Sequence, residues 1–491
     1  EPADRALEHS LTFALIEIAD AKGTAAGLHS ANARVRRAAL TALDQMDGGE
    51  LSPAAVTREF ASTDAALKET AWWIAGRHPE WASAVTNSLR DHLSAAADLT
   101  PAAQEELVGR LTHFAGSKAI QQMLVERLTA AAAGRIALRA MSRSNLKEAP
   151  ENWIAGLADV LSNGNADLHA EAIDAVRALR IPRKQSAKLA AILLQIGGDD
   201  KAPEKVRAGA LAAVPGGLAK VEPALFSFLR SHLDSEQPVA VRGAAAEVLA
   251  KAKLDAGQLV ALTETLKAVG PLELNRLLDA FAQSTDDKVG LTLLSALKDA
   301  PALSSLRVET LKPILAKYSP AVQSQAEKLY AALNVDAEKQ KARLEQLLAS
   351  LKDGDVRRGQ AVFNSAKAAC AACHAIGYLG GKVGPDLTHI GKVRAERDLL
   401  ESIVFPSASL VRSFESVQVT TKSGKVHNGL VIRDTPDEVV LATGPNQEAR
   451  ITRNDIDEVL PSKVSVMPAG LDQQLTAREL ADLVAFLKAC K

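Results

Sequence analysis

Residues 1 to about 345 repeat a helical pattern of apolar and polar positions. In residues 31–44 the apolar side chains recur at i, i+3, i+4 and i+7, which is the spacing of one face of an α-helix. Similar stretches return as a small polar turn, then Val-Arg or a near equivalent, then small residues ending in Leu. Examples are residues 65–73, 168–176, 205–212 and 240–249. The pattern predicts helix after helix.

The repeated phrase also predicts how these helices are arranged. It returns at a period of roughly 35 to 45 residues, which is typical of stacked helix pairs. The phrase resembles the second helix of a HEAT repeat, and about eight such pairs would form an α-solenoid over residues 1–345. Its Ala and Gly residues would let neighbouring helices approach closely. An ordinary globular helical bundle is the alternative.

A second domain is predicted over residues 346–491. The repeats give way near residues 334–336, and residues 337–353 form a charged amphipathic helix that ends at Gly354. Further helices are expected at residues 356–363, near 399–405 and at 480–487.

Between the last two of these helices the period changes from helical to alternating. This indicates a small antiparallel β insertion at about 414–460, with four strands separated by short turns. The four strands are expected at residues 415–421, 426–432, 439–441 and 449–452.

Composition narrows the classes of function. The chain has 491 residues, with Lys+Arg 58 against Asp+Glu 59 and a net charge of −1, so its overall balance does not indicate nucleic acid or an anionic membrane as a partner. Hydrophobic residues reach 47% and aromatic residues only 3%, as in closely packed helices. The sequence contains no run of eighteen apolar residues, so it predicts no transmembrane helix. Because the chain opens at Glu1 without a leader pattern, we interpret it as mature or as a piece of a longer protein.

Cys370-Ala371-Ala372-Cys373-His374 is the most specific chemical signal in the chain. C-x-x-C-H is the attachment pattern of c-type haem, in which two thiols add to the porphyrin vinyl groups and the histidine ligates iron. On one helical turn Cys370 and Cys373 share a face. With 3 Cys and 10 His in 491 residues, a chance match is expected on the order of once in a thousand such chains. We therefore predict one covalent haem c.

Two other chemistries fit this motif less well. A thioredoxin-like dithiol would need a βαβ context, and a zinc site would need a second Cys/His pair at ligand spacing. Only Cys490 remains, one residue from the end of the chain, and no role is assigned to it.

The second axial ligand is predicted to be Met467. It is the only methionine in this half of the chain, and it lies in a proline-containing loop, residues 465–471, before the last helix. His389, His427 and an empty position are the alternatives. His427 falls on an expected strand, and His389 follows closely behind the attachment helix.

Residues around the motif resemble class I cytochromes c. Gly359 and Phe363 resemble the small and aromatic residues of the first helix in that fold, which crosses the last helix near its own aromatic residue, here within residues 480–487. The run Gly384-Pro385-Asp386-Leu387 resembles the loop after the attachment motif. The resemblance implies that the Pro385 carbonyl accepts a hydrogen bond from the second ring nitrogen of His374.

The order of motifs over residues 350–491 resembles the planctomycete–verrucomicrobium type of cytochrome c-like haem domain. Residues 7–10, 36–40 and 76–81 resemble the HEAT-like region that often precedes it. In many members a β-propeller resembling quinone-dependent sugar dehydrogenases stands further upstream, and the sequence has no such propeller. The resemblance implies the electron-accepting part of a sugar- or alcohol-type dehydrogenase, with the catalytic part elsewhere.

These observations predict the function. A His/Met iron stays six-coordinate in both oxidation states, so it passes single electrons and makes no bonds to substrate. The expected partner is a redox protein that docks on the solenoid, and the expected location is the periplasm or another extracytoplasmic space. The β insertion would cover a haem edge as a lid or dock the partner. The alternative is a haem enzyme, peroxidase-like or oxygen-binding, with an open axial position.

Overall fold

The computed structural model describes residues 5–144, 146–163, 165–333 and 337–491. Helices make up 62% of the protein, and 26 α-helices lie in the described ranges. A five-stranded antiparallel sheet and a short two-stranded hairpin complete the secondary structure. The mainly helical fold class with a small antiparallel sheet is confirmed.

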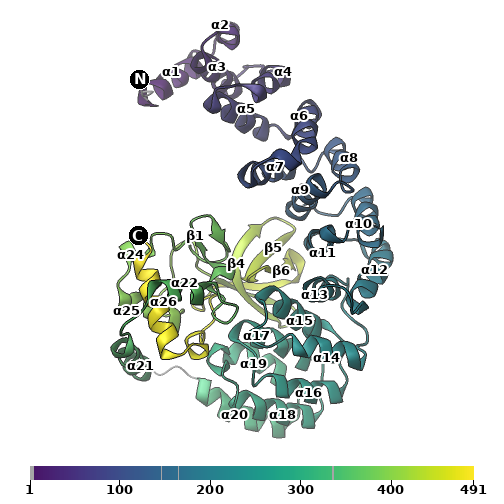
Figure 1. The fold of residues 1–491 in the computed structure, drawn as a ribbon, viewed down its shortest axis with the longest axis vertical. Coiled ribbons are helices and arrows are strands. Elements are labelled where there is room, and N and C mark those ends of the chain that lie inside the picture. The colour runs from purple at the N-terminus through teal and green to yellow at the C-terminus, as the bar shows by residue number, and fades with distance from the viewer. Residues whose placement is uncertain (1–4, 145, 164, 334–336) are drawn as a thin grey trace. The chain divides into compact units, whose positions relative to one another are not determined.

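The chain separates into two compact units: residues 1–199 with 213–215, and residues 200–212 with 216–491. In the first unit alternate helices pack on each other (Figure 1): α4, α6, α8, α10 and α12 form one row, while α1–α3–α5 and α7–α9–α11 pack in the other layer. The bounds are α1 (Arg5–Ile18), α2 (Ala21–Ala26), α3 (Ala33–Gln45), α4 (Pro53–Thr57), α5 (Ala65–Arg77), α6 (Ala82–Ser94), α7 (Pro101–His113), α8 (Lys118–Glu126), α9 (Ala131–Arg143), α10 (Glu151–Asn163), α11 (His169–Ala178) and α12 (Ser186–Gly198).

The helices that open the second unit are arranged in two rows of their own. One row holds α13, α15, α17 and α19, and the other holds α14, α16, α18 and α20. Small side chains permit close packing, and three successive alanines of α15, residues 244–246, are buried. The bounds are α13 (Glu204–Ala212), α14 (Pro223–Ser231), α15 (Val239–Lys251), α16 (Ala256–Thr265), α17 (Pro271–Phe281), α18 (Asp287–Lys298), α19 (Val308–Leu315) and α20 (Pro320–Leu333). The expected end of the repeats at residues 334–336 lies outside the described residues.

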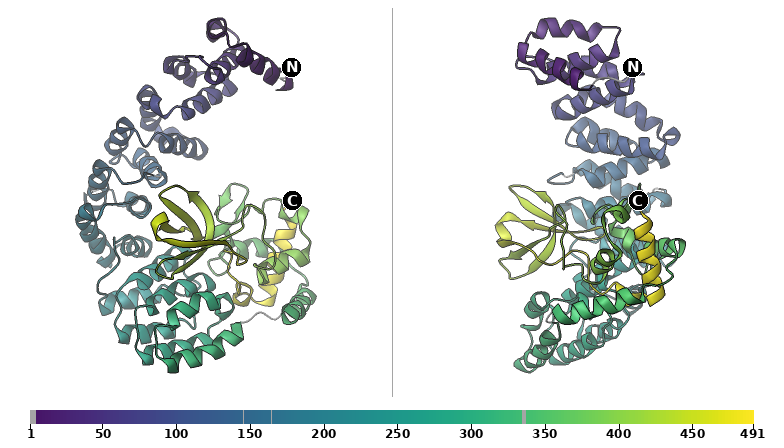
Figure 2. Two further views of the ribbon diagram at one scale, coloured as in Figure 1. Left: turned by 180° about the vertical axis from the view of Figure 1, so that it is seen from behind. Right: turned by 90° about the vertical axis from the view of Figure 1, so that its left-hand side faces the viewer.

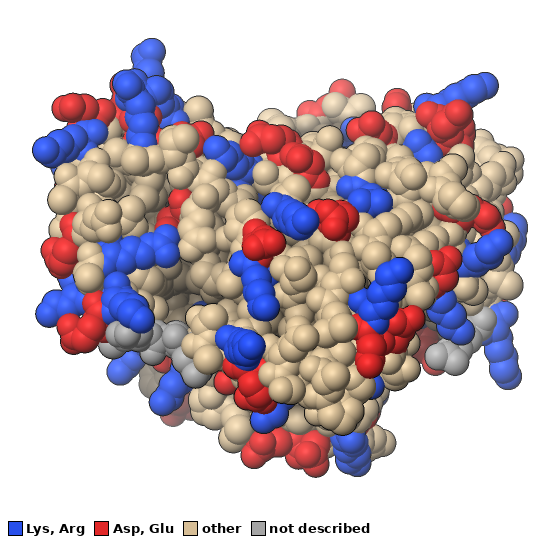
Figure 3. Space-filling view, turned by 90° about the horizontal axis from the view of Figure 1, so that it is seen from below, with Lys and Arg blue, Asp and Glu red and all other residues tan. Residues whose placement is uncertain are grey.

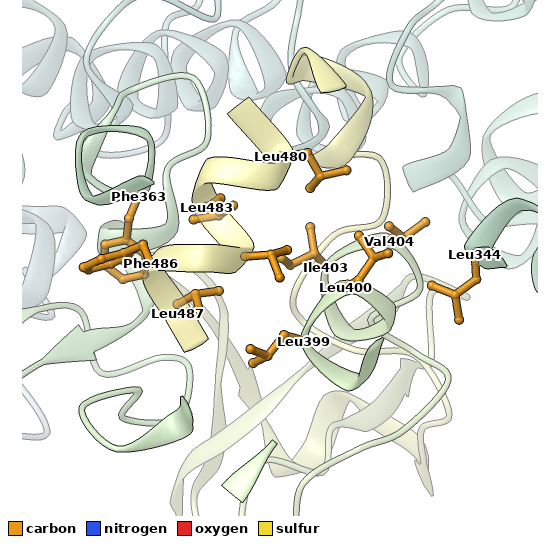
Figure 4. Close-up of a cluster of buried hydrophobic side chains, with 11 residues drawn as sticks. Leu344, Phe363, Leu399, Leu400, Ile403, Val404, Leu480, Leu483, Phe486 and Leu487 are labelled. Carbon is orange, nitrogen blue, oxygen red and sulfur yellow. The ribbon is translucent and has the colours of Figure 1, made fainter. Parts of the chain in front are cut away.

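The remaining helices share one apolar core (Figure 4). They are α21 (Ala337–Ser350), α22 (Val356–Asn364), α23 (Cys370–Cys373), α24 (Ile390–Val393), α25 (Glu396–Val404) and α26 (Ala477–Ala489). Leu344 of α21 is buried in the same cluster as Leu400 of α25 and Leu483 of α26. The expected domain boundary at 345/346 therefore falls inside a continuous helix whose side chains contribute to this core.

Helices α22 and α26 cross at very close range. A Cβ atom added at Gly359 would lie 1.9 Å from the Asp482 carbonyl oxygen, so only glycine fits at the crossing. One turn further along, the rings of Phe363 and Phe486 pack with their centroids 5.6 Å apart. The small residue, the aromatic pair and the crossing all lie where the sequence resemblance places them.

The sheet has the strand order β6-β5-β4-β3-β7, and Figure 2 shows its twist. Its core is Val419, Val439, Leu441 and Ile451. The bounds are β3 (Val417–Thr421), β4 (Val426–Asp434), β5 (Glu438–Gly444), β6 (Gln447–Thr452) and β7 (Ile456–Pro461), with β1 (Ala375–Ile376) and β2 (Leu379–Gly380) forming the separate hairpin. The sequence predicts four strands. The fifth, β7, pairs with β3 and has no regular alternation of apolar and polar residues, so the period gives no signal.

None of the helices in the described ranges is both long and apolar enough to cross a bilayer.

Gly359→Ala is expected to lower the free energy of unfolding by about 1–3 kcal/mol, because a methyl group would force α22 and α26 apart. Denaturant unfolding followed by circular dichroism measures this change. Gly109→Ala in α7 is the matched control: its new Cβ would meet nothing within 4 Å, so it should stabilise that helix by up to about 1 kcal/mol. A Gly359 variant as stable as the parent would contradict the close crossing.

Asp482 gives the crossing a pH dependence. Its buried carboxylate accepts hydrogen bonds from the Asp355 amide at 2.6 Å and from Nε and Nη2 of Arg358 at 2.7 and 2.8 Å. The hydrogen bonds from Arg358 hold the pKa of Asp482 below its ordinary value of 3.8, against the opposing effect of burial.

A lowered pKa means that the ionised carboxylate stabilises the folded state above pH 3.8 and that this contribution is lost as the pH falls further. The parent should therefore be more stable than Asp482→Asn by a margin that is constant above about pH 5 and shrinks in stronger acid. Urea unfolding of both proteins across this range measures the margin. A margin that stays the same into acid would show that the Asp482 charge does not contribute.

Candidate haem site

The attachment motif forms a single helical turn, α23 (Cys370–Cys373). The turn begins abruptly, because Ala369 has φ 56°, a left-handed conformation that costs energy for alanine. Both cysteines are free thiols and partly exposed. Their i, i+3 spacing within the turn puts both side chains on one face of α23, as the sequence predicts.

The two thiols are neutral at physiological pH. Burial raises the pKa of Cys370 to about 12 and that of Cys373 to about 11. A dithiol redox site instead requires a cysteine whose pKa is lowered toward 7 by a nearby positive charge or a helix N-terminus. This electrostatic environment does not favour the thioredoxin-like alternative.

His374 follows the turn in extended conformation, with φ −106° and ψ 138°. Its Nδ1 lies 2.8 Å from the Pro385 carbonyl oxygen, the contact that the cytochrome c resemblance implies. A carbonyl oxygen can only accept, so Nδ1 carries the proton and Nε2 keeps its lone pair. Burial lowers the pKa of His374, and the hydrogen bond to Pro385 only partly opposes this effect. The imidazole is therefore held in the neutral tautomer that can bind a metal.

The loop that carries Pro385 is hydrogen-bonded to the backbone on both sides of His374. The Gly384 amide donates to the Cys373 carbonyl and the Leu387 amide to the Ala375 carbonyl, each at 2.8 Å. Gly384 also lies against the imidazole face: a Cβ there would be 2.5 Å from Cε1 of His374. The ring orientation thus depends on the absence of a side chain at position 384.

The three candidates for the second axial ligand lie in different elements. Met467 is half-buried in the loop between β7 and α26, and its amide donates to Ser465 Oγ at 3.1 Å. His389 is exposed at the start of α24. His427 is half-buried on β4, where burial lowers its pKa and Lys425 adds to that effect.

Arg242 of α15 is a residue near the site that sequence reasoning missed. Its guanidinium is buried and pairs with Glu273 of α17, with Nε 2.7 Å from the carboxylate. Nη1 also donates to the Ala366 carbonyl at 2.8 Å, four residues before Cys370. The only signal in the sequence is the recurring Val-Arg phrase, which indicates a repeat and carries no hint of this contact.

These donors fit a covalently attached haem: two neutral thiols on one face of a turn, and an oriented imidazole. Within the described ranges, no three His, Cys, Asp or Glu side chains come together as they would around a metal ion. A haem iron takes only two protein ligands, so this finding does not test the haem prediction.

No protein-family model matches this chain, and no curated protein matches it. The family resemblance therefore stays a prediction from the sequence motifs.

Gly384→Ala is expected to displace the His374 ring, because the new methyl group would overlap the imidazole. The fraction of purified chain that carries haem, from haem absorbance against protein absorbance, should fall severalfold, and the remaining haem should show a mixed-spin spectrum. Gly116→Ala is the control, since a Cβ there meets nothing within 4 Å. Normal haem loading with a low-spin spectrum in the Gly384 variant would show that the loop can yield without moving the ligand.

Proposed function

We propose that this protein is a c-type cytochrome that carries single electrons. The observation that carries the proposal is the C-x-x-C-H turn whose histidine donates Nδ1–H to the Pro385 carbonyl at 2.8 Å. Cys370 and Cys373 would hold the haem covalently, and His374 and Met467 would be its axial ligands. Haem bound in this way supplies an iron that exchanges one electron at a raised potential.

The chain's own residues would keep the iron coordinated in both oxidation states. Pro385 fixes the tautomer and increases the basicity of His374, and Gly384 fixes the plane of its ring. The loop around Met467 would hold the thioether on the opposite side. A site closed on both sides favours electron transfer over binding of oxygen or peroxide.

The helical repeats would act as a HEAT-like solenoid that docks the redox partner. The two rows of alternate helices support this interpretation, because such rows leave long surfaces for binding. Acidic and basic side chains are interspersed on the face drawn in Figure 3, and the net charge is only −1. Recognition would therefore depend on shape and local contacts more than on one strong field.

The partner and the location follow from the chemistry and the resemblance. By resemblance, the electron donor would be a sugar- or alcohol-type dehydrogenase, on another segment or another subunit. Covalent attachment of haem to reduced thiols takes place outside the bacterial cytoplasm, so we place the protein in the periplasm or an equivalent space. A haem enzyme with an open axial position is the competing function, and substitution of Met467 separates the two.

Met467→Leu removes the sulfur and keeps the size of the side chain. The parent is expected to show a sulfur-to-iron charge-transfer band and to resist carbon monoxide in the ferrous state. The variant should lose the band, bind carbon monoxide readily and have a lower reduction potential. Absorption spectra and a potentiometric titration measure these changes.

His389→Ala and His427→Ala are the matched controls, because each removes one rival ligand and should leave the spectrum unchanged. If the parent itself binds carbon monoxide at once, the carrier function is wrong and the open-site enzyme takes its place. If His389→Ala or His427→Ala opens the iron instead, the ligand assignment to Met467 is wrong.

A further inference from the structure

The loop that carries Met467, residues 462–475, is anchored by the β-sheet at its beginning. The Val464 carbonyl accepts hydrogen bonds from Ser416 Oγ, just before β3, and from Asn428 Nδ2 on β4, the latter at 3.1 Å. The Ser462 amide donates to the Ser416 carbonyl at 2.9 Å. The residue before β3 and one residue of β4 thus hold the chain three residues before Met467.

The hydrogen bonds continue to Met467 itself. The Ser465 amide donates to Ser407 Oγ, beyond the end of α25, at 3.1 Å. The Met467 amide donates to Ser465 Oγ at the same distance. Because these contacts follow one another along the backbone, the position of residue 467 depends on where Val464 is held.

The other end of the loop is held by Ser304, between α18 and α19, and by α21. Gly470, with φ +89°, lies so close to Ser304 that a Cβ would be 2.6 Å from its hydroxyl oxygen. Asp472 forms an ion pair with Arg343 of α21, and the side-chain amide group of Gln473 is hydrogen-bonded to the Ser304 hydroxyl at 3.2 Å. The loop is therefore fixed at both ends, and the freedom left to Met467 is small.

The side-chain amide group of Asn428 holds Val464 and leaves its own oxygen without a partner. Its Oδ1 is buried without a hydrogen-bond partner, while its Nδ2 donates to Val464. A buried acceptor without a hydrogen-bond partner lowers the stability of the folded state. If the side-chain amide group were turned over, Oδ1 would face the Val464 carbonyl oxygen, and two acceptors cannot form a hydrogen bond. The orientation of Asn428 is therefore set by its hydrogen bond to the loop. The sheet also has its own buried core, which makes it a firm support.

We propose that the β insertion is a positioning frame for the axial methionine, with Ser416 and Asn428 as its positioning residues. By holding the Val464 carbonyl, they keep the Met467 sulfur from leaving the iron and so slow the entry of outside ligands. This inference rests on the proposed function, because it takes Met467 as the ligand. It gives the insertion a mechanical role in place of a lid or a docking surface.

The test uses the full chain with haem attached and measures the rate at which cyanide binds the ferric protein. Cyanide must wait for the methionine to leave, so this rate reports how often the loop opens. Asn428→Leu and Ser416→Ala each remove one hydrogen bond to Val464 and should each raise the rate roughly two- to tenfold. The charge-transfer band should remain, since the ligand still returns.

Two controls separate positioning from general stability. Gln418→Leu also replaces an amide side chain by leucine, on β3 at the cross-strand partner of Asn428, and should keep the parent's rate. Val439→Ala weakens the sheet core away from the loop. The proposal is wrong if Asn428→Leu and Ser416→Ala bind cyanide at the parent's rate, or if Val439→Ala accelerates binding as much as they do.

Hydrogen exchange of the Ser465 and Met467 amides gives a second readout that does not depend on iron. Exchange should be faster in Asn428→Leu than in Gln418→Leu, and equal rates would overturn the frame. Failure of the proposed function looks different: the parent's own spectrum would then lack the charge-transfer band before any sheet residue is changed.

Discussion

The structure of the candidate site depends on the close crossing of α22 and α26. Helix α22 leads directly into the attachment turn, and α26 follows directly on the Met467 loop. The crossing therefore fixes the end of the Met467 loop and the beginning of the segment that leads to the attachment turn. These two points are about a hundred residues apart in the chain. Gly359 permits the approach, and the Asp482 carboxylate holds the first turn of α22 through the Asp355 amide and Arg358. A wider crossing would separate the two sides of the site.

Much of this arrangement could be predicted from the sequence, because its signals are local. Helical periodicity depends on neighbours three and four residues apart, so the sequence predicts the helices of residues 1–345 as well as α22, α25 and α26. The attachment motif is five consecutive residues, and Gly359 and Phe363 lie one turn apart on one helix. The sequence does not predict strand β7, because β7 is a mostly exposed edge strand. Its position is decided by pairing with β3 and not by its own pattern of residues.

The contacts that the sequence could not predict have a common physical reason. Arg242 donates to the Ala366 carbonyl, and Asn428 and Ser416 donate to the Val464 carbonyl. Every residue has a backbone carbonyl, so the accepting residue carries no mark in the sequence. The donors are polar residues of ordinary kinds, and only the tertiary fold selects their partners. The hydrogen bond from His374 to the Pro385 carbonyl is of the same kind and was anticipated only through resemblance.

These backbone contacts also change how the domain boundary should be understood. The sequence divides the chain at 345/346, but Leu344 lies in the core beneath α25 and α26, and Arg242 reaches the segment before Cys370. The Arg242–Glu273 pair is buried between α15 and α17, where an ion pair contributes little net stability but strongly penalises any arrangement that leaves one charge unpaired. Moving α15 relative to α17 would break that pair and remove the donor to Ala366 together. Helices α15 and α17 are therefore part of the support of the candidate site.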